Sequence, residues 1–111
     1  MNYDLPNKLM EAANKVEEIG ILYAEAKALS WLLQEQKKVV LASEMRVSEG
    51  KSATEKEQNA LCSEVYKTHL EGTKEAIAEE LRLKAMLSRC EYSFEGYRSL
   101  MSLEKQKIQM T

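Results

Sequence analysis

Hydrophobic positions in the first half of the chain recur at alternating steps of four and three residues. Apart from Gly20, no helix-breaking residue lies between Pro6 and Gly50. This spacing places apolar side chains on one face of a helix, so we predict a helix over about residues 6–48 that packs on a partner. The predicted face comprises Leu9, Ala12, Val16, Ile19 and Tyr23 and, after a small change of phase near Gly20, Leu22, Ala26, Leu29, Leu33, Gln36, Val40, Ser43 and Val47.

The second half of the chain carries a repeat that is more regular. The same alternation of four and three predicts a second helix over about residues 63–109 and, because it is sustained, left-handed coiled-coil packing. The repeat consists of Leu83, Leu87, Cys90, Phe94, Tyr97 and Met101, with Ile108 one heptad beyond. Upstream, on a slightly rotated line, the apolar face continues through Leu70, Ile77 and Leu81.

A turn is predicted at about residues 49–53, followed by a short helix over about residues 54–61. Gly50 stands where a left-handed residue often closes a helix, so we predict such a cap there. The run Gly50-Lys51-Ser52 also occurs in phosphate-binding loops. That loop requires a preceding strand and a glycine five residues earlier, where this chain has Met45. The residues therefore favour a helix-ending turn.

Two residue pairs have the spacing of a capping box at the start of the short helix. They are Thr54 with Glu57 and Ser52 with Glu55. Ser63 offers a second N-cap, at the start of the long helix that follows. The short helix is therefore predicted either as a separate element or as the bent beginning of the long one.

The distribution of charge selects how the two long helices pair. Residues 1–25 carry a net charge of −3 and residues 82–107 carry +3, while residues 27–51 carry +2 and residues 55–80 carry −4. An antiparallel pair places opposite charges side by side, whereas a parallel pair places like charges together. Each exposed pair contributes only about 0.2–1 kcal/mol, but the pattern favours one orientation. We predict an all-α fold in which residues 1–111 form a single domain, a long antiparallel helical hairpin of the coiled-coil type.

The composition of the chain is typical of a protein made of long helices. Among 111 residues, 31% are charged and 44% hydrophobic, with one Pro and four Gly. The net charge of −2 argues against a protein that coats duplex DNA non-specifically. No apolar run reaches the roughly 18–20 residues that span a bilayer, and the N-terminus lacks the features of a signal peptide. We therefore expect a cytoplasmic protein without a membrane contact.

Groups suited to catalysis or metal binding are sparse. Cys62 and Cys90 are separated by about 42 Å along a continuous helix, so they cannot pair within one chain. His69 is the single histidine, and it lacks the glutamate three residues before it that metal sites in helical bundles use. We therefore expect no catalytic residue, no metal, no cofactor and no enzymatic activity.

Large apolar residues also lie outside the predicted pairing faces. Such side chains usually pack against a further surface, and self-association is the first interpretation. A folded-back N-terminus, the short helix or a different partner protein are the alternatives. The predicted oligomer face comprises Ile21, Ala24, Ala28, Trp31, Leu100 and Leu103.

Basic residues form two groups that are candidates for contact with single-stranded nucleic acid or with a protein partner. Lysine and arginine neutralise phosphates while aromatic residues such as Tyr92 and Tyr97 stack on bases. A solvated helix face is the alternative for each residue. The candidates are Lys37, Lys38, Arg46 and Lys51 near the turn, and Arg82, Arg89 and Arg98 on the second long helix.

Several short motifs resemble those of a group of small bacteriophage proteins, over roughly residues 20–103. The motifs are Glu49-Gly50-Lys51-Ser52-Ala53-Thr54-Glu55, Tyr66, His69-Leu70-Glu71-Gly72 and Phe94-Glu95-Gly96-Tyr97-Arg98-Ser99. Proteins of that group are commonly encoded beside phage recombination genes, and their helical-hairpin layout is similar to the T4-type recombination mediator, whose oligomers help to load a recombinase onto single-stranded DNA. The resemblance implies contact roles first for Lys51, Arg89 and Arg98. Tyr97 stands where the group often has tryptophan.

These observations lead to a hypothesis of function. The chain is expected to be a non-enzymatic phage accessory protein of DNA recombination or replication, acting as a homo-oligomer in the cytoplasm of an infected bacterium. It would bind a recombinase or an annealing protein, and single-stranded DNA is a further candidate ligand. Two alternatives are an inhibitor that occludes a host defence enzyme and a structural coiled-coil adapter.

Overall fold

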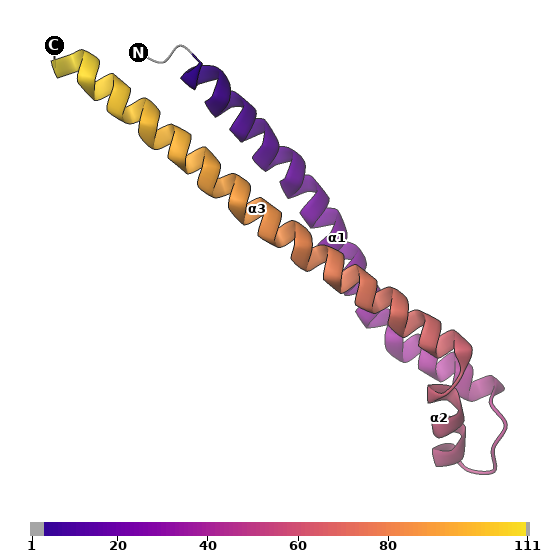
Figure 1. The fold of residues 1–111 in the computed structure, drawn as a ribbon. Coiled ribbons are helices and arrows are strands. Elements are labelled where there is room, and N and C mark those ends of the chain that lie inside the picture. Colours follow the sequence, from indigo (N-terminus) through magenta and orange to yellow (C-terminus); the bar gives the residue numbers. More distant parts are fainter. Residues whose placement is uncertain (1–3, 111) are drawn as a thin grey trace. The chain divides into compact units, whose positions relative to one another are not determined.

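The computed structural model describes residues 4–110 and is all-α (Figure 1). The helices are α1 (Leu5–Val47), α2 (Ala53–Leu61) and α3 (Glu64–Met110), and the described residues contain no strand. Each helix begins and ends within one residue of its predicted bounds. The prediction of an all-α helical hairpin with a short helix near the turn is confirmed.

The start of α1 follows from its first residues. The backbone N–H of Lys8 donates to the carbonyl of Asp4 at 2.9 Å, which closes the first turn. Pro6 lies within that turn, where its missing N–H removes no helical hydrogen bond. No further proline follows along the chain, and Gly20 is accommodated without a break, so α1 continues for 43 residues.

A capping box fixes the start of α2. Ser52 is the N-cap, with extended backbone angles (φ −130°, ψ 162°), and its Oγ accepts a hydrogen bond from Glu55 N at 3.1 Å. In return, Glu55 Oε2 accepts from the backbone N–H of Lys51 at 3.2 Å. The side-chain amide of Asn59 donates to the carbonyl of Glu49 and ties the turn to α2. Of the two predicted boxes, the structure forms Ser52 with Glu55.

Gly50 does not have the left-handed conformation that we predicted. None of the described glycines has a positive φ angle, so Gly50 is no left-handed cap. Instead, α2 folds back closely on the turn. A Cβ atom on Gly50 would lie 3.1 Å from the backbone nitrogen of Lys56 and 3.3 Å from Glu55 Cγ. A side chain at this position would be crowded by α2, so lack of space rather than backbone freedom favours a glycine there.

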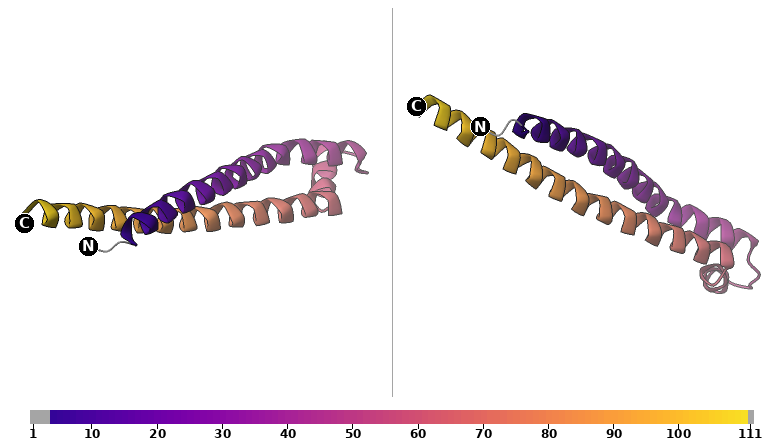
Figure 2. Two further views of the ribbon diagram at one scale, coloured as in Figure 1. Left: turned by 90° about the horizontal axis from the view of Figure 1, so that it is seen from above. Right: turned by 45° about the horizontal axis from the view of Figure 1, so that its top comes forward.

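A second cap separates α2 from α3. Ser63 Oγ accepts from the backbone N–H of Tyr66 at 3.2 Å, as predicted for this residue. Two further bonds, from Cys62 N to Asn59 O and from Ser63 N to Ala60 O, close the end of α2. The axis of α2 consequently turns away from that of α3, and the two are separate helices (Figure 2).

The contacts between the helices divide the chain into two compact units. Unit 1 consists of the described residues of Met1–Ala24 and Leu81–Thr111, so the start of α1 packs beside the end of α3 in the opposite direction. This confirms the antiparallel pairing that the charges predicted. The most buried apolar side chains of unit 1 are Leu5, Ile19 and Leu83. Half-buried side chains complete the contact row: Leu9, Ala12, Val16 and Tyr23 on α1, and Leu87, Cys90, Phe94, Tyr97 and Met101 on α3.

Unit 2 comprises Glu25–Glu80 and contains the end of α1, α2 and the start of α3. Most of its buried side chains are small or polar, and Tyr66 is the large one. Apolar burial therefore contributes little to the stability of unit 2 for a segment of its length. Its buried residues are Ser30, Ala60, Tyr66, Thr73 and Ala76.

Hydrogen bonds satisfy the polar groups between the helices of unit 2. Ser30 Oγ accepts from Gln34 Nε2 at 2.9 Å, and Thr73 Oγ1 donates to the carbonyl of His69 at 2.8 Å. His69 Nε2 lies 2.9 Å from the carbonyl oxygen of Leu33 and donates to it, because a carbonyl only accepts. That last bond links α3 directly to α1.

The contact row of α1 differs from our prediction beyond Gly20. We expected a change of phase that would bury Leu22, Leu29 and Val47, but their side chains are 43%, 52% and 74% exposed. The helix passes Gly20 without interruption, so positions seven residues beyond Ile19 and Tyr23 stay on the same face. The row continues through Ala26, Ser30 and Leu33.

The upstream part of α3 shows the same displacement by one position. We predicted Leu70 and Leu81 on the apolar face, but they are 39% and 57% exposed, while Ile77 is half-buried. His69 and Thr73 occupy the contact row instead. Alternating steps of three and four residues, counted back from Leu83, reach Thr73 and His69. The regular geometry of α3 therefore places these two polar residues on the contact row.

Candidate functional site

The four basic candidates of unit 2 lie in the last part of α1 and in the turn that follows it. Lys37, Lys38, Arg46 and Lys51 are all exposed. The backbone N–H of Lys51 belongs to the capping box of α2. Lys37 lines a shallow groove of about 460 Å³ together with Gln34, Leu70, Thr73, Lys74 and Ile77.

The three basic candidates of unit 1 lie along α3 in different settings. Arg82 Nη1 is 3.1 Å from the sulfur of Met86. Arg98 is held by Glu95, with 3.1 Å between Nη1 and Oε1, and its guanidinium lies 6.0 Å from the centre of the Phe94 ring. Both partners of that ion pair are more than half exposed, so the pair orients Arg98 more than it stabilises the fold.

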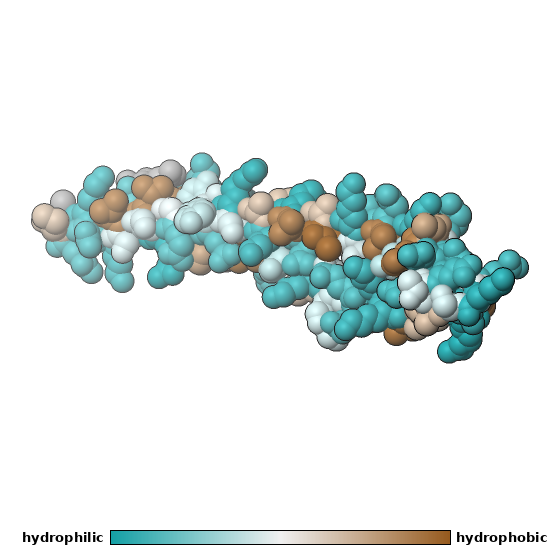
Figure 3. Space-filling view, turned by 90° about the horizontal axis from the view of Figure 1, so that it is seen from below, coloured by the Kyte–Doolittle hydropathy of each residue, from teal (hydrophilic) through white to brown (hydrophobic). Residues whose placement is uncertain are grey.

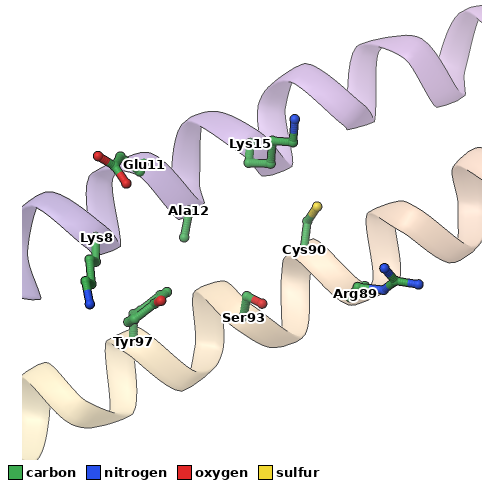
Figure 4. Close-up of a pocket in the computed structure, with 8 residues that line it drawn as sticks. All are labelled: Lys8, Glu11, Ala12, Lys15, Arg89, Cys90, Ser93 and Tyr97. Carbon is green, nitrogen blue, oxygen red and sulfur yellow. The ribbon is translucent and has the colours of Figure 1, made fainter.

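Arg89 lines a groove between α1 and α3, which we call the lysine groove (Figure 4). Its volume is about 400 Å³. Lys8 and Tyr97 lie at one end of the groove, and Lys15 and Cys90 at the other. The ammonium of Lys15 is 3.8 Å from Glu18, in an exposed ion pair. The lining residues are Lys8, Glu11, Ala12, Lys15, Arg89, Cys90, Ser93 and Tyr97.

Arg98 lines a second groove of unit 1, about 390 Å³ in volume, which we call the terminal groove. Its lining combines apolar side chains with two basic ones. Leu5 is 4% exposed and forms part of the floor, while Met101 is half-buried. The lining residues are Leu5, Arg98, Met101, Ser102, Glu104, Lys105 and Ile108.

Several lining residues were absent from our predicted site. Lys8 and Lys15 lie in the acidic N-terminal part of the chain, where a sum of charges conceals them. Leu5 and Ile108 become neighbours of one groove only through the pairing of the chain ends. The antiparallel charge pattern already indicates that pairing. Alignment of the start of the first helix with the end of the last one would therefore have identified Leu5 and Ile108 as neighbours.

The predicted oligomer face is solvent-exposed in the structure. Ile21 is 54% exposed and Trp31 is 63% exposed, and both alanines of the same stripe, Ala24 and Ala28, are exposed. Hydrophobic side chains reach the surface between hydrophilic ones in the space-filling view (Figure 3). On α3, exposure is 49% for Leu100 and 54% for Leu103.

Other chemistry has little support in the described part of the chain. Residues 4–110 contain no group of three or more His, Cys, Asp or Glu side chains placed to hold a metal ion. Cys62 is exposed and Cys90 half-buried, and both are free thiols. None of the three described helices has a segment apolar enough to cross a membrane.

Comparison with known proteins adds no relative: no family model, no curated protein and no solved structure matches the chain. The class of the molecule is therefore defined by its fold, an all-α helical hairpin. The two grooves and the exposed apolar side chains are the features from which a function can be argued.

Proposed function

We propose that this chain is a non-enzymatic accessory protein of phage DNA recombination or replication, which acts by binding other proteins and further copies of itself. The observation that carries the proposal is the exposure of large apolar side chains along regular helices, with Trp31 at 63%. Tryptophan is among the residues that contribute most to protein interfaces, and contiguous exposed apolar side chains mark surfaces that bind a partner.

The energetics of the hairpin support association. A pair of helices that meet along one row buries little apolar surface, and small structures of this kind are marginally stable alone. In unit 2 the row itself is partly polar, with Ser30 and Thr73 buried. Apolar residues such as Leu29 and Leu32 lie outside it, 52% and 45% exposed. Burial of these side chains in an oligomer or against a partner would supply the apolar contacts that the single chain lacks.

The recombination setting rests on the motif residues of the turn and of the last part of α3. They resemble phage proteins encoded beside recombination genes, so a recombinase or an annealing protein is the proposed partner. Single-stranded DNA is a second proposed ligand, since Arg89 and two lysines line one groove together with Tyr97. The proposed place of action is the cytoplasm of an infected bacterium.

Two measurements test the proposal. Analytical ultracentrifugation of the pure protein should give a species larger than one chain, and a stable monomer at every concentration would contradict self-association. Binding of a fluorescent single-stranded oligonucleotide should weaken steeply with added salt, because released counterions drive such binding.

The second measurement also separates the alternatives. An associating protein that binds no oligonucleotide at low salt, and that captures no recombinase or annealing protein, would instead be an inhibitor of a host enzyme or a structural adapter. The variant Trp31→Ser should lose self-association. Its helical circular dichroism should persist, because the side chain is mostly exposed in the single chain.

A further inference from the structure

We propose that copies of this chain associate side by side, with one side of unit 2 in one copy docked on the opposite side of unit 2 in the next copy. One of these sides carries lysines around a groove, and the other carries glutamates beside apolar side chains. This inference rests on the self-association proposed above and deepens it, since it names the two surfaces that meet.

The first surface, which we call the lysine side, surrounds the groove of about 460 Å³ in unit 2. Lys37 lines this groove from α1 and Lys74 from α3, and its apolar lining consists of Leu70, 39% exposed, and the half-buried Ile77. None of the described residues that line the groove is acidic. Neither lysine forms an ion pair with another residue of the described chain. The lysine side therefore presents positive charge beside an apolar floor.

The second surface, which we call the glutamate side, lies across the contact row from the groove. An α-helix turns by about 100° per residue, so Lys74 and Glu75, which follow Thr73 of the row, fall on opposite sides of that row. On α1, Glu25 precedes the groove residue Gln34 by nine residues, or two and a half turns, and therefore points away from the groove. Both glutamates are exposed, and neither forms an ion pair with another described residue.

Apolar side chains accompany the charges on the glutamate side. Leu29 and Leu32 follow Glu25 by four and seven residues, so they share its side of α1, and they are 52% and 45% exposed. Docked on the lysine side of a second copy, these leucines would meet the apolar floor of the groove. The glutamates would meet Lys37 and Lys74. Opposite charges across an interface determine which surfaces pair, so the two sides are complementary in charge and in apolar character.

A second copy is the occupant that this arrangement fits. The lysine side and the glutamate side belong to the same segment, Glu25–Glu80, so every copy presents both. A contact between different surfaces of identical chains is heterologous and can repeat from copy to copy. Two lysine sides, or two glutamate sides, would bring like charges together, which opposes a symmetrical pair through either surface. Repeated docking would also cover apolar side chains that the single chain leaves in water.

Reversal of charge on each side tests the contact in the full chain. Lys37→Glu with Lys74→Glu should weaken self-association at least about tenfold, and Glu25→Lys with Glu75→Lys should do the same, because like charges then face each other. An equal mixture of the two variants should regain the size of the wild type, since the acidic sides of one variant meet the basic sides of the other. Sedimentation velocity at physiological ionic strength compares the wild type, each variant and the mixture.

A matched control separates the contact from an effect of net charge. Lys84→Glu with Lys105→Glu makes the same change of net charge on exposed positions of unit 1. Its self-association should stay within about twofold of the wild type, because neither side of unit 2 is altered. Equal weakening by this control and by Lys37→Glu with Lys74→Glu would overturn the inference. Circular dichroism confirms that each variant is folded.

The outcomes distinguish this inference from the proposed function. If the variants of unit 2 keep the size of the wild type, or if their mixture is no larger than each variant alone, the inference is overturned while self-association of the wild type still stands. A monomeric wild type overturns both. If a single-stranded oligonucleotide binds the wild type and not Lys37→Glu with Lys74→Glu, and the size is the same in both, the lysine side belongs to nucleic acid and docking of a second copy there is overturned.

Discussion

Ser30 is the most buried residue in the contact row of unit 2, at 0% exposure. Its hydroxyl accepts one hydrogen bond, from the exposed Gln34 side chain. Ser30→Ala should raise the free energy of unfolding by about 0.5 kcal/mol, because alanine has the higher helix propensity and Gln34 can turn to water. Urea denaturation followed by circular dichroism measures the change.

A larger residue at the same position tests whether the row has spare room. Ser30→Leu should lower the free energy of unfolding by about 1–3 kcal/mol, because the extra carbons enter a space that is already filled. A leucine variant that is more stable than the wild type would contradict the observed packing and would favour the more apolar row that hydrophobicity alone predicts.

Ser30 and His69 also show where sequence reasoning at the residue scale fails. Hydrophobicity assigned the row to Leu29 and Leu70, each one position away from the residue that the structure places there. The apolar row of unit 1 fixes the phase of each helix, and a regular helix then carries that phase onward. Position in the helix, rather than the character of the individual side chain, decides which residue faces the partner.

Among the helices, α3 contains two glycines whose space is open. A Cβ atom on Gly72 or on Gly96 would have no neighbour within 4 Å. Gly72→Ala and Gly96→Ala should each raise the free energy of unfolding by about 1 kcal/mol, because alanine restricts the unfolded chain and favours the helix. Thermal and urea denaturation check this. A loss of stability at either position would show that another chain approaches the helix there.

Capping of α2 gives a second prediction for an element. Ser52→Ala removes the oxygen that accepts from Glu55 N and should destabilise α2 by about 1 kcal/mol. Backbone amides of Ala53–Leu61 should then exchange with deuterium about fivefold faster, which mass spectrometry of that segment detects. Thr54→Ala is the control, since Ser52 is the N-cap, and it should change exchange much less. Equal effects of both variants would contradict the assigned cap.

The elements themselves were predictable to within one residue, because their limits depend on local chemistry. Pro6 and the serines that cap α2 and α3 affect only the backbone of the few residues next to them. Steric and hydrogen-bonding requirements between such close neighbours can be recognised in the sequence. The conformation of Gly50 was not predictable in this way. It depends on the return of α2 against the turn, a contact that local spacing does not contain.

At the scale of the whole molecule, the sequence predicted the direction of pairing but not the sites. Opposite net charges at matched distances from the turn were sufficient to indicate antiparallel helices. The basic candidates follow from residue type alone, and three of them, Lys37, Arg89 and Arg98, line three different grooves. The terminal groove depends on which turn of α1 faces which turn of α3, since Leu5 and Ile108 line it from the two helices. That register follows from side-chain packing along the full row.

Trp31 allows self-association to be measured directly, because it is the single tryptophan of the chain and is 63% exposed. If further copies cover the stripe around it, its fluorescence emission should shift to shorter wavelength as protein concentration rises, and quenching by acrylamide should fall.

The control for this measurement is Ala24→Glu with Ala28→Glu, which places two charges on the same stripe and keeps Trp31 as the fluorescent residue. This variant should keep its helix content and show emission independent of concentration, since burial of unpaired charge opposes association. The association would be contradicted if the wild-type emission is constant with concentration and sedimentation shows a monomer. If the shift persists in the charged variant, the interface lies on another face of the helices.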